Sequence, residues 1–177
     1  IVGIGYTVYI GSSFEADMFG QAARIIYKAH KAGMLAVIWM YPRGKAIKDK
    51  DEKNNAHLLA GAAGVGLTLG ADFIKINYPY NKDGRTIAER FREVTRAAGR
   101  SKVICVGGSK KDPKKYLNTL HHQINIAGTM GNATGRNIFQ RELNEAVRMA
   151  NAISSISLYD YPVEDAYKIF QGRKQLK

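Results

Sequence analysis

The chain alternates between short apolar segments and helical segments, and this alternation occurs five times in a row. The apolar segments are expected to be strands and cover residues 1–10, 35–41, 71–78, 102–106 and 131–134. A stretch with apolar residues at helical spacing follows each of them. Five such units predict an α/β fold with a parallel sheet covered by helices. Two architectures fit this pattern, namely an open doubly wound sheet and part of a (β/α)₈ barrel.

Capping residues predict where several helices begin. Ser12 with Glu15, and Thr86 with Glu89, have the spacing of a capping box. Asp112, with proline next in the sequence, is expected to cap a further helix. The last main helix is expected to be long, because one apolar stripe continues through Phe139, Leu143, Val147, Ala150 and Ile153.

Length and composition limit the class of protein. A chain of 177 residues with 45% hydrophobic residues fits one domain with a sizeable core. Cys105 is the single cysteine, which excludes a disulfide framework and is compatible with the cytoplasm. The longest weakly polar run, 58–71, is too short and too rich in glycine to span a membrane. The net charge of +12 favours an anionic partner, either nucleic acid or a phosphorylated small molecule.

A lone lysine, Lys75, lies within an apolar strand. Strand parity places Ile74 and Ile76 towards the covering helices and Lys75 on the opposite face. Trp39 and Tyr41 share a face of the preceding strand and can converge on the same cavity. Burial lowers the pKa of a lysine, and a neutral amine forms a Schiff base with a carbonyl. The alternatives are a lysine that extends to solvent or pairs with an acid, and aromatic residues that only fill the core.

Two glycine-containing loops follow the next two strands. They read "VGGS" over 106–109 and "TGRN" over 134–137. Glycines allow backbone N–H groups to approach an anion, and a helix N-terminus after each loop would favour negative charge. Arg136 can add a charged clamp. The two loops therefore predict a phosphate site, with two ordinary turns as the alternative.

Four motifs carry a resemblance to a known family. They are "WMYPRG" over 39–44, "GADFIKINYP" over 70–79, "CVGGS" over 105–109 and "GNATGRNIFQR" over 131–141. In these motifs, and in their order and spacing, the chain resembles the archaeal-type class I fructose-bisphosphate aldolases. These are Schiff-base aldolases of the DeoC/FbaB-like superfamily on (β/α)₈ TIM barrels.

The resemblance implies a role for each candidate residue. Lys75 would form the imine with dihydroxyacetone phosphate, Tyr41 would donate and accept protons, and Trp39 would line the substrate site. Arg43 would be a further substrate contact. The substrate phosphate would be held by Gly107, Gly108, Ser109, Gly135 and Arg136. The resemblance further implies a cytoplasmic homo-oligomer, specifically a decamer, that uses neither a metal nor a cofactor.

The expected function is metal-independent cleavage of fructose 1,6-bisphosphate to dihydroxyacetone phosphate and glyceraldehyde 3-phosphate, and the reverse reaction. A related Schiff-base enzyme, 2-amino-3,7-dideoxy-heptulosonate synthase, is one alternative. That branch tends to lack the tryptophan of "WMYPRG", so Trp39 favours the aldolase. An alternative of another class is a non-catalytic module that binds RNA or another polyanion, which the charge of +12 alone supports.

The resemblance also implies that residues 1–177 form a single aldolase-type barrel domain of which the N-terminal βα units are missing. The first strand here corresponds to the family's fourth, so the chain covers the last five βα units. Five units cannot close an eight-stranded barrel. We expect a preceding segment of roughly 100 residues, at about 30 residues per βα unit. The strands at 1–10 and 131–134 would be the sheet edges, and the inward faces of Val37, Phe73 and Cys105 would lack an opposite wall.

Overall fold

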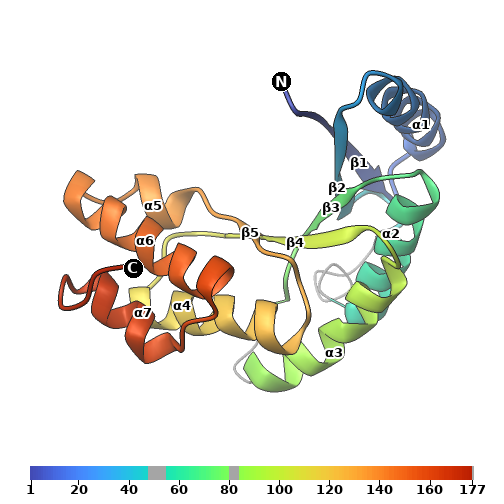
Figure 1. Ribbon diagram of the computed structural model, residues 1–177. Coiled ribbons are helices and arrows are strands. Elements are labelled where there is room, and N and C mark those ends of the chain that lie inside the picture. The colour runs from blue at the N-terminus through green and yellow to red at the C-terminus, as the bar shows by residue number, and fades with distance from the viewer. Residues whose placement is uncertain (48–54, 80–83, 177) are drawn as a thin grey trace.

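The computed structural model describes residues 1–47, 55–79 and 84–176 (Figure 1). The strands are β1 (Gly3–Ile10), β2 (Leu35–Pro42), β3 (Phe73–Ile76), β4 (Lys102–Val106) and β5 (Asn132–Ala133). The helices are α1 (Glu15–Lys31), α2 (Ala56–Thr68), α3 (Gly84–Ala97), α4 (Pro113–His121), a π-helical turn η2 (His122–Ile126), α5 (Arg136–Phe139), α6 (Leu143–Tyr159) and α7 (Val163–Phe170). None of the helices described is long and apolar enough to cross a membrane.

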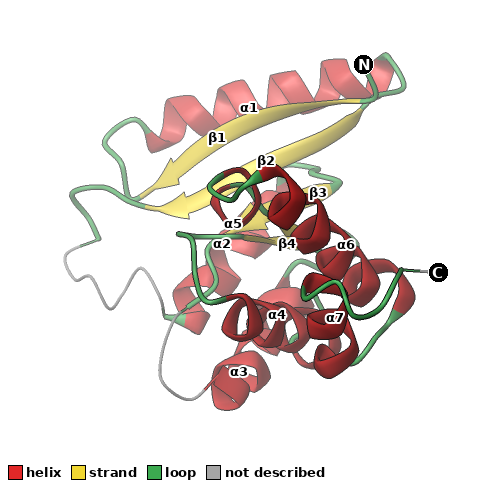
Figure 2. Ribbon diagram, turned by 90° about the vertical axis from the view of Figure 1, so that its left-hand side faces the viewer, coloured by secondary structure: helices red, strands yellow, loops and turns green. Residues whose placement is uncertain are grey.

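The strand order distinguishes the two expected architectures. The sheet runs β1-β2-β3-β4-β5, and every neighbouring pair is parallel. A doubly wound sheet reverses its strand order at a switch point, whereas a barrel keeps adding strands in one direction. The fold is therefore part of a (β/α)₈ barrel, as expected, with β1 and β5 at the edges. Figure 2 shows α1 running alongside β1, with which it is in contact.

One face of the sheet forms the main core. Val8, Ile38, Ile74 and Val103 are all almost fully buried there, packed against the apolar sides of α1, α2 and α3. Side chains of opposite parity are half-buried or exposed and form the inward face. This division of the faces fixes the direction in which the functional side chains point.

The strand parity expected for Cys105 is wrong. In the register of β3 and β4, Cys105 pairs with Ile76, which faces the helices. Cys105 is accordingly fully buried in the main core, and this burial raises the pKa of its thiol. Ile104 and Val106 take the inward positions of β4, where they are half-buried. Val37 and Phe73 lie on the inward face, as the sequence predicts.

The capping box expected at Ser12 and Glu15 does not form. Helix α1 begins at Glu15, and its N-cap residue, Phe14, makes no side-chain cap. The carboxylate of Glu15 instead accepts a hydrogen bond of 2.5 Å from the backbone N–H of Gly11. Ser12 Oγ accepts from the N–H of Phe14 at 3.2 Å, which closes a turn before the helix rather than its first turn.

The other two expected helix starts differ in outcome. Helix α3 already begins at Gly84, so Thr86 lies inside its first turn and is not its cap. Asp112 is the N-cap of α4, as expected. Its side chain accepts a hydrogen bond of 2.9 Å from the N–H of Lys115, and Pro113 occupies the first turn.

The expected long final helix is broken in two. Helix α5 ends at Phe139 and α6 begins only at Leu143. Phe139, Leu143 and Val147 are 70%, 77% and 52% exposed, so their stripe is not a core face. The buried face of α6 is a different one, which carries Met149, Ala152 and Ile156. These residues form a second core with α4 and α7.

Candidate active site

Lys75 lies on the inward face of β3, directly beside Trp39 of β2. The two residues are register partners in the parallel pair. The Nζ atom of Lys75 lies 4.9 Å from the centroid of the Trp39 ring, within the range of a cation–π contact. Burial lowers the pKa of Lys75, and no other cause contributes to that shift. Strand parity therefore brings these two residues together as the sequence predicts.

Gly5 of β1 makes room for the ring of Trp39. A Cβ atom at Gly5 would overlap the six-membered ring of the indole. The indole therefore lies against the bare backbone of β1 on one side and near Lys75 on the other. Sequence reasoning missed Gly5, although its parity in β1 is a signal that could have placed it on the inward face.

Tyr41 lies two residues beyond Trp39 on the same face of β2. Its ring stacks on Tyr9 of β1, with centroids 6.4 Å apart, and the guanidinium carbon of Arg43 lies 5.2 Å from its centroid. Burial raises the pKa of Tyr41, the positive charge of Arg43 opposes this effect, and Tyr9 adds to it. The net rise in pKa favours the protonated phenol. Tyr9 is a further neighbour of the site that sequence reasoning missed.

Tyr41 and Lys75 are placed at different depths. Two strand residues span about 7 Å, so Tyr41 is that far beyond Trp39 towards the end of its strand. Lys75 lies beside Trp39, one residue before the end of β3. The amine and the phenol are therefore offset from each other along the strand direction.

The loops after β4 and β5 are bonded to each other. The Nδ2 atom of Asn137 donates to the carbonyl oxygens of Gly107 and Ser109, at 2.9 and 3.0 Å. The Nε atom of Arg136 donates to the carbonyl oxygen of Gly108 at 3.0 Å. Gly108 has a φ of +68°, a conformation that favours glycine. The predicted phosphate residues of the two loops are thus neighbours.

Gly107 differs from the other predicted phosphate residues. Its N–H already donates to the carbonyl oxygen of Ala133 at 3.0 Å. A Cβ atom at Gly107 would lie 2.9 Å from the Cα of Thr134, so glycine allows the two loops to approach closely. Gly107 therefore contributes to the packing of the loops, while the N–H groups after it remain for a ligand.

The two helix N-termini are not placed or built to attract an anion to these loops as predicted. Helix α4 begins at Pro113, beyond the "VGGS" loop, and its first turn is already capped by Asp112. Helix α5 follows Gly135 directly but has only 4 residues, too few for a strong helix dipole. The donors that these loops offer are therefore individual backbone N–H groups and the side chain of Arg136.

The candidate residues share one edge of the sheet. Tyr41 and Lys75 lie near the carboxyl ends of their strands, and the two loops follow the carboxyl ends of β4 and β5. Because all five strands are parallel, these ends meet at the same edge (Figure 1). That edge is where barrel enzymes carry their chemistry.

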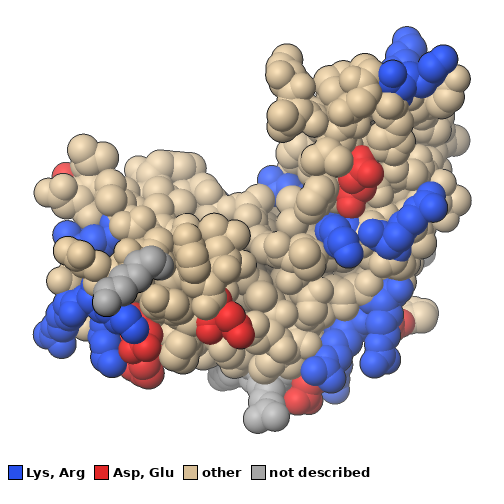
Figure 3. All heavy atoms as spheres, viewed as in Figure 1, with Lys and Arg blue, Asp and Glu red and all other residues tan. Residues whose placement is uncertain are grey.

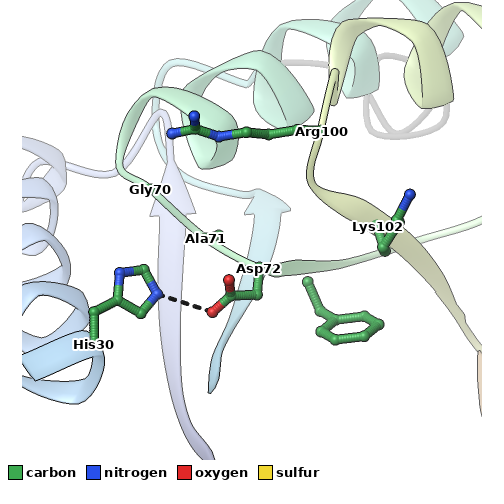
Figure 4. Close-up of a pocket in the computed structure, with 7 residues that line it drawn as sticks. His30, Gly70, Ala71, Asp72, Arg100 and Lys102 are labelled. Atoms are coloured by element: carbon green, nitrogen blue, oxygen red, sulfur yellow. Dashed lines mark hydrogen bonds and ion pairs between the residues drawn. The ribbon is translucent and has the colours of Figure 1, made fainter. Parts of the chain in front are cut away.

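A separate cavity of about 440 Å³ lies at the opposite, amino-terminal ends of the strands (Figure 4). There the Oδ2 atom of Asp72 accepts a hydrogen bond of 2.7 Å from the N–H of Ala36 and lies 2.9 Å from Nε2 of His30. Burial alone would raise the pKa of Asp72, but these contacts and nearby Arg100 lower it. This cluster ties α1, β2 and β3 together and serves the fold rather than the chemistry.

The chain is similar to known aldolases along its whole length. A match to the DeoC/LacD family aldolase covers residues 1–141. The chain is 50% identical over 175 residues to the fructose-bisphosphate aldolase/6-deoxy-5-ketofructose 1-phosphate synthase of Methanocaldococcus jannaschii, covering 99% of this chain and 54% of that protein. It is 36% identical over 154 residues to the class 1 fructose-bisphosphate aldolase of Thermoproteus tenax, covering 86% of this chain and 54% of that protein. The chain thus spans about half the length of the curated relatives it matches.

Solved structures agree with this similarity. The fructose-bisphosphate aldolase of Slackia heliotrinireducens superposes with a TM-score of 0.91 at 49% identity, covering 98% of this chain and 54% of that chain. An archaeal fructose-1,6-bisphosphate aldolase with its catalytic lysine bound to a carbinolamine intermediate superposes with a TM-score of 0.76 at 33% identity, covering 88% of this chain and 58% of that chain.

The contact between Lys75 and Trp39 can be measured directly, because Trp39 is the single tryptophan. We expect its fluorescence to change in a pH titration with a midpoint below the usual lysine value of about 10.4, as Lys75 loses its charge. The Lys75→Met variant should lose this transition, whereas Lys102→Met, at the other end of the sheet, should keep it. An unchanged titration in Lys75→Met would show that the amine does not lie against the indole.

Proposed function

The chain belongs to the DeoC/LacD family of aldolases, and on this premise we propose that the protein is a class I fructose-bisphosphate aldolase. The reaction is the reversible cleavage of fructose 1,6-bisphosphate to dihydroxyacetone phosphate and glyceraldehyde 3-phosphate. The observation that carries the proposal is the placement of Lys75. It is an inward-facing lysine with a pKa lowered by burial, next to Trp39 and near the carboxyl ends of the strands.

Lys75 supplies the covalent step. Its neutral amine attacks the ketone carbon of dihydroxyacetone phosphate, and loss of water gives a protonated imine. Transfer of a proton from the neighbouring carbon to the oxygen of Tyr41 gives an enamine, because the imine accepts the electron pair. The enamine carbon then attacks the aldehyde carbon of glyceraldehyde 3-phosphate. Hydrolysis of the resulting imine releases the bisphosphate and restores the amine. Cleavage follows the same steps in reverse.

Tyr41 supplies the proton in this scheme. Once it holds the proton taken from the carbon, the phenol donates to the aldehyde oxygen as the carbon–carbon bond forms, and burial, which raises its pKa, favours this protonated form. In the cleavage direction the phenolate accepts that proton back. Arg43, stacked over the ring of Tyr41, stabilises the negative charge of the phenolate. Trp39 limits the space around Lys75 and excludes water from one side of it.

The loops after β4 and β5 supply the phosphate site. The backbone N–H groups of Gly108, Ser109 and Gly135 and the guanidinium of Arg136 are the proposed donors. The terminal nitrogens of Arg136 remain for a bidentate contact, since its Nε is used by Gly108. A net charge of +12 raises the local concentration of a bisphosphate in the same way that it would favour other anions.

A second candidate function is 6-deoxy-5-ketofructose 1-phosphate synthesis. The 50% identical relative from Methanocaldococcus jannaschii carries that activity in its name beside fructose-bisphosphate aldolase. Product analysis with each pair of substrates separates the two functions. The names of the relatives favour these two functions over the heptulosonate synthase.

The polyanion-binding alternative is weaker, because acidic side chains lie among the basic ones on the face in Figure 3 and interrupt any basic band.

We further propose that residues 1–177 belong to a single barrel domain that three more βα units complete, and that it forms a homo-oligomer in the cytoplasm. Relatives about twice as long support the first part. An exposed apolar row on α5 and α6, formed by Phe139, Leu143 and Val147, supports a covering partner or segment. The metabolic context in this proposal is glycolysis and gluconeogenesis.

Mass measurement tests this assembly. We expect an intact mass well above the 19.6 kDa of these 177 residues, and light scattering should give a multiple of that intact mass. The charged variant Val147→Glu should lower the oligomeric mass, whereas Asn151→Asp, an exposed change on the same helix, should not. A fully active monomer of 19.6 kDa would contradict both the completed barrel and the oligomer.

Borohydride trapping tests the role of Lys75. Reduction in the presence of dihydroxyacetone phosphate should add one triose phosphate to the protein, and peptide mapping should place it on Lys75. Lys111 is an internal control, since burial lowers its pKa as well. The Lys75→Met variant should lose both the label and the lyase activity, and a chelator should leave wild-type activity unchanged. Label on Lys111, or inhibition by the chelator, would argue against this mechanism.

The Tyr41→Phe variant tests proton transfer. Removal of the hydroxyl should lower kcat for cleavage by about 10²- to 10⁴-fold, the usual range for a lost acid–base group. The Tyr9→Phe variant is a matched control, because it removes a hydroxyl from the ring stacked on Tyr41. Its kcat should change far less. Near wild-type turnover in Tyr41→Phe would reduce Tyr41 to a packing residue.

A further inference from the structure

Asn137 is a fully buried polar residue between the two proposed phosphate loops. Its Nδ2 atom donates to the carbonyl oxygens of Gly107 and Ser109, and its Oδ1 atom accepts from the N–H of Lys111 at 2.9 Å. Both donors and the acceptor of the amide are therefore used within one loop. Arg141, almost fully buried, adds bonds from its side chain to the backbone carbonyls of Asn137 and Lys111.

These bonds fix the direction of the N–H groups in the loop after β4. In a trans peptide, the carbonyl of one residue and the N–H of the next point in opposite directions. The carbonyls of Gly107 and Ser109 point at Asn137, so the N–H groups of Gly108 and Lys110 point away from it. The carbonyl of Gly108 points at Arg136, and the N–H of Ser109 is turned away in the same manner.

The three N–H groups have a further property in common. Within the described part of the chain, those of Gly108, Ser109 and Lys110 have no hydrogen-bond acceptor. Successive unpaired N–H groups on one side of a loop form a concave donor surface that suits an anion. The orientation of this surface depends on the carbonyls behind it, and Asn137 holds two of the three.

We propose that Asn137 is a positioning residue for the phosphate of the substrate, which it orients through the loop without touching it. This inference rests on the proposed function, because it takes the ligand of the loop to be a phosphate group. Asparagine suits the position because it combines two donors with one acceptor. Aspartate has nearly the same shape but would set a carboxylate oxygen against two carbonyl oxygens, and the peptides would turn.

The Asn137→Asp variant in the complete natural protein tests the inference. The dissociation constant for inorganic phosphate and the KM for fructose 1,6-bisphosphate should both rise by about 10- to 100-fold, the range for a lost buried hydrogen-bond partner. Borohydride labelling of Lys75 by dihydroxyacetone, which carries no phosphate, should stay within about twofold of wild type, as for a surface substitution. The exposed Asn151→Asp on α6 is the matched control and should leave all three quantities unchanged.

The outcomes separate positioning from general stability. Unchanged phosphate affinity in Asn137→Asp would overturn the inference. A parallel loss of phosphate affinity and of dihydroxyacetone labelling would also overturn it, because a merely structural role affects both. If Asn137→Asp does not fold, the Asn137→Ser variant replaces it in the test. The serine hydroxyl can still donate to one of the two carbonyls, so the phosphate affinity of this variant should be weaker than that of wild type but not lost. If the wild-type protein has no lyase activity, the proposed function is wrong. The phosphate affinities of wild type and Asn137→Asp would still test whether Asn137 positions the loop.

Discussion

The placement of Lys75 depends on the pleat of β3. Ile74 and Ile76 are fully buried against the helices, and a shift of one residue in either direction would put Lys75 into the core in place of one of them. The main core therefore forces the amine to the inward face, where partial burial lowers its pKa and no described carboxylate offsets the loss of hydration. The indole of Trp39, 4.9 Å away, offers only a cation–π contact, which compensates in part. The stability of the core and the lowered pKa of Lys75 thus have the same cause.

Much of this arrangement follows from sequence because it depends on short-range periodicity. The alternation in 35–41 and 71–78 predicts which side chains of β2 and β3 meet, and the structure places Trp39 beside Lys75 accordingly. Parity does not carry from one strand to the next, however. The face of Cys105 is set by its pairing with Ile76, a long-range register that no single strand encodes, and for this reason its predicted face is wrong.

Helix boundaries show the same division between local and distant causes. Asp112 caps α4 through a bond to Lys115, three residues away, and its role is readable from sequence. The break between α5 and α6 is not, because Arg141 there bonds to the carbonyl of Lys111, thirty residues earlier in the chain. The capping box at Ser12 fails for a related reason, since the carboxylate of Glu15 is taken by the N–H of Gly11 in the strand-to-helix turn.

The proposed anion site depends on a different physical cause from the one that the sequence predicts. The glycines of the loops indicate close approach by an anion, and the sequence pattern predicts that helix N-termini supply the attraction. In the structure, α4 starts too late and α5 is too short to supply it. In the proposed site, the orientation of individual peptide groups after β4 takes the place of a helix dipole. The side chains of Arg136 and Asn137 in the next loop set that orientation. The proposed role of Asn137 could not be predicted from the motif "TGRN". It depends on the burial of Asn137 against the loop after β4, which only the folded structure shows.

The inward face connects the amine to the rest of the proposed barrel. With five strands, Val37 and Phe73 are only half-buried, and Lys75 is half-buried as well, although this burial already lowers its pKa. Three further strands would set a second wall opposite these residues and remove more water from the amine. Desolvation would then lower its pKa further, and every polar contact to the substrate would act in a less hydrated medium. Closing the barrel therefore contributes to the chemistry as well as to the stability of the sheet edges.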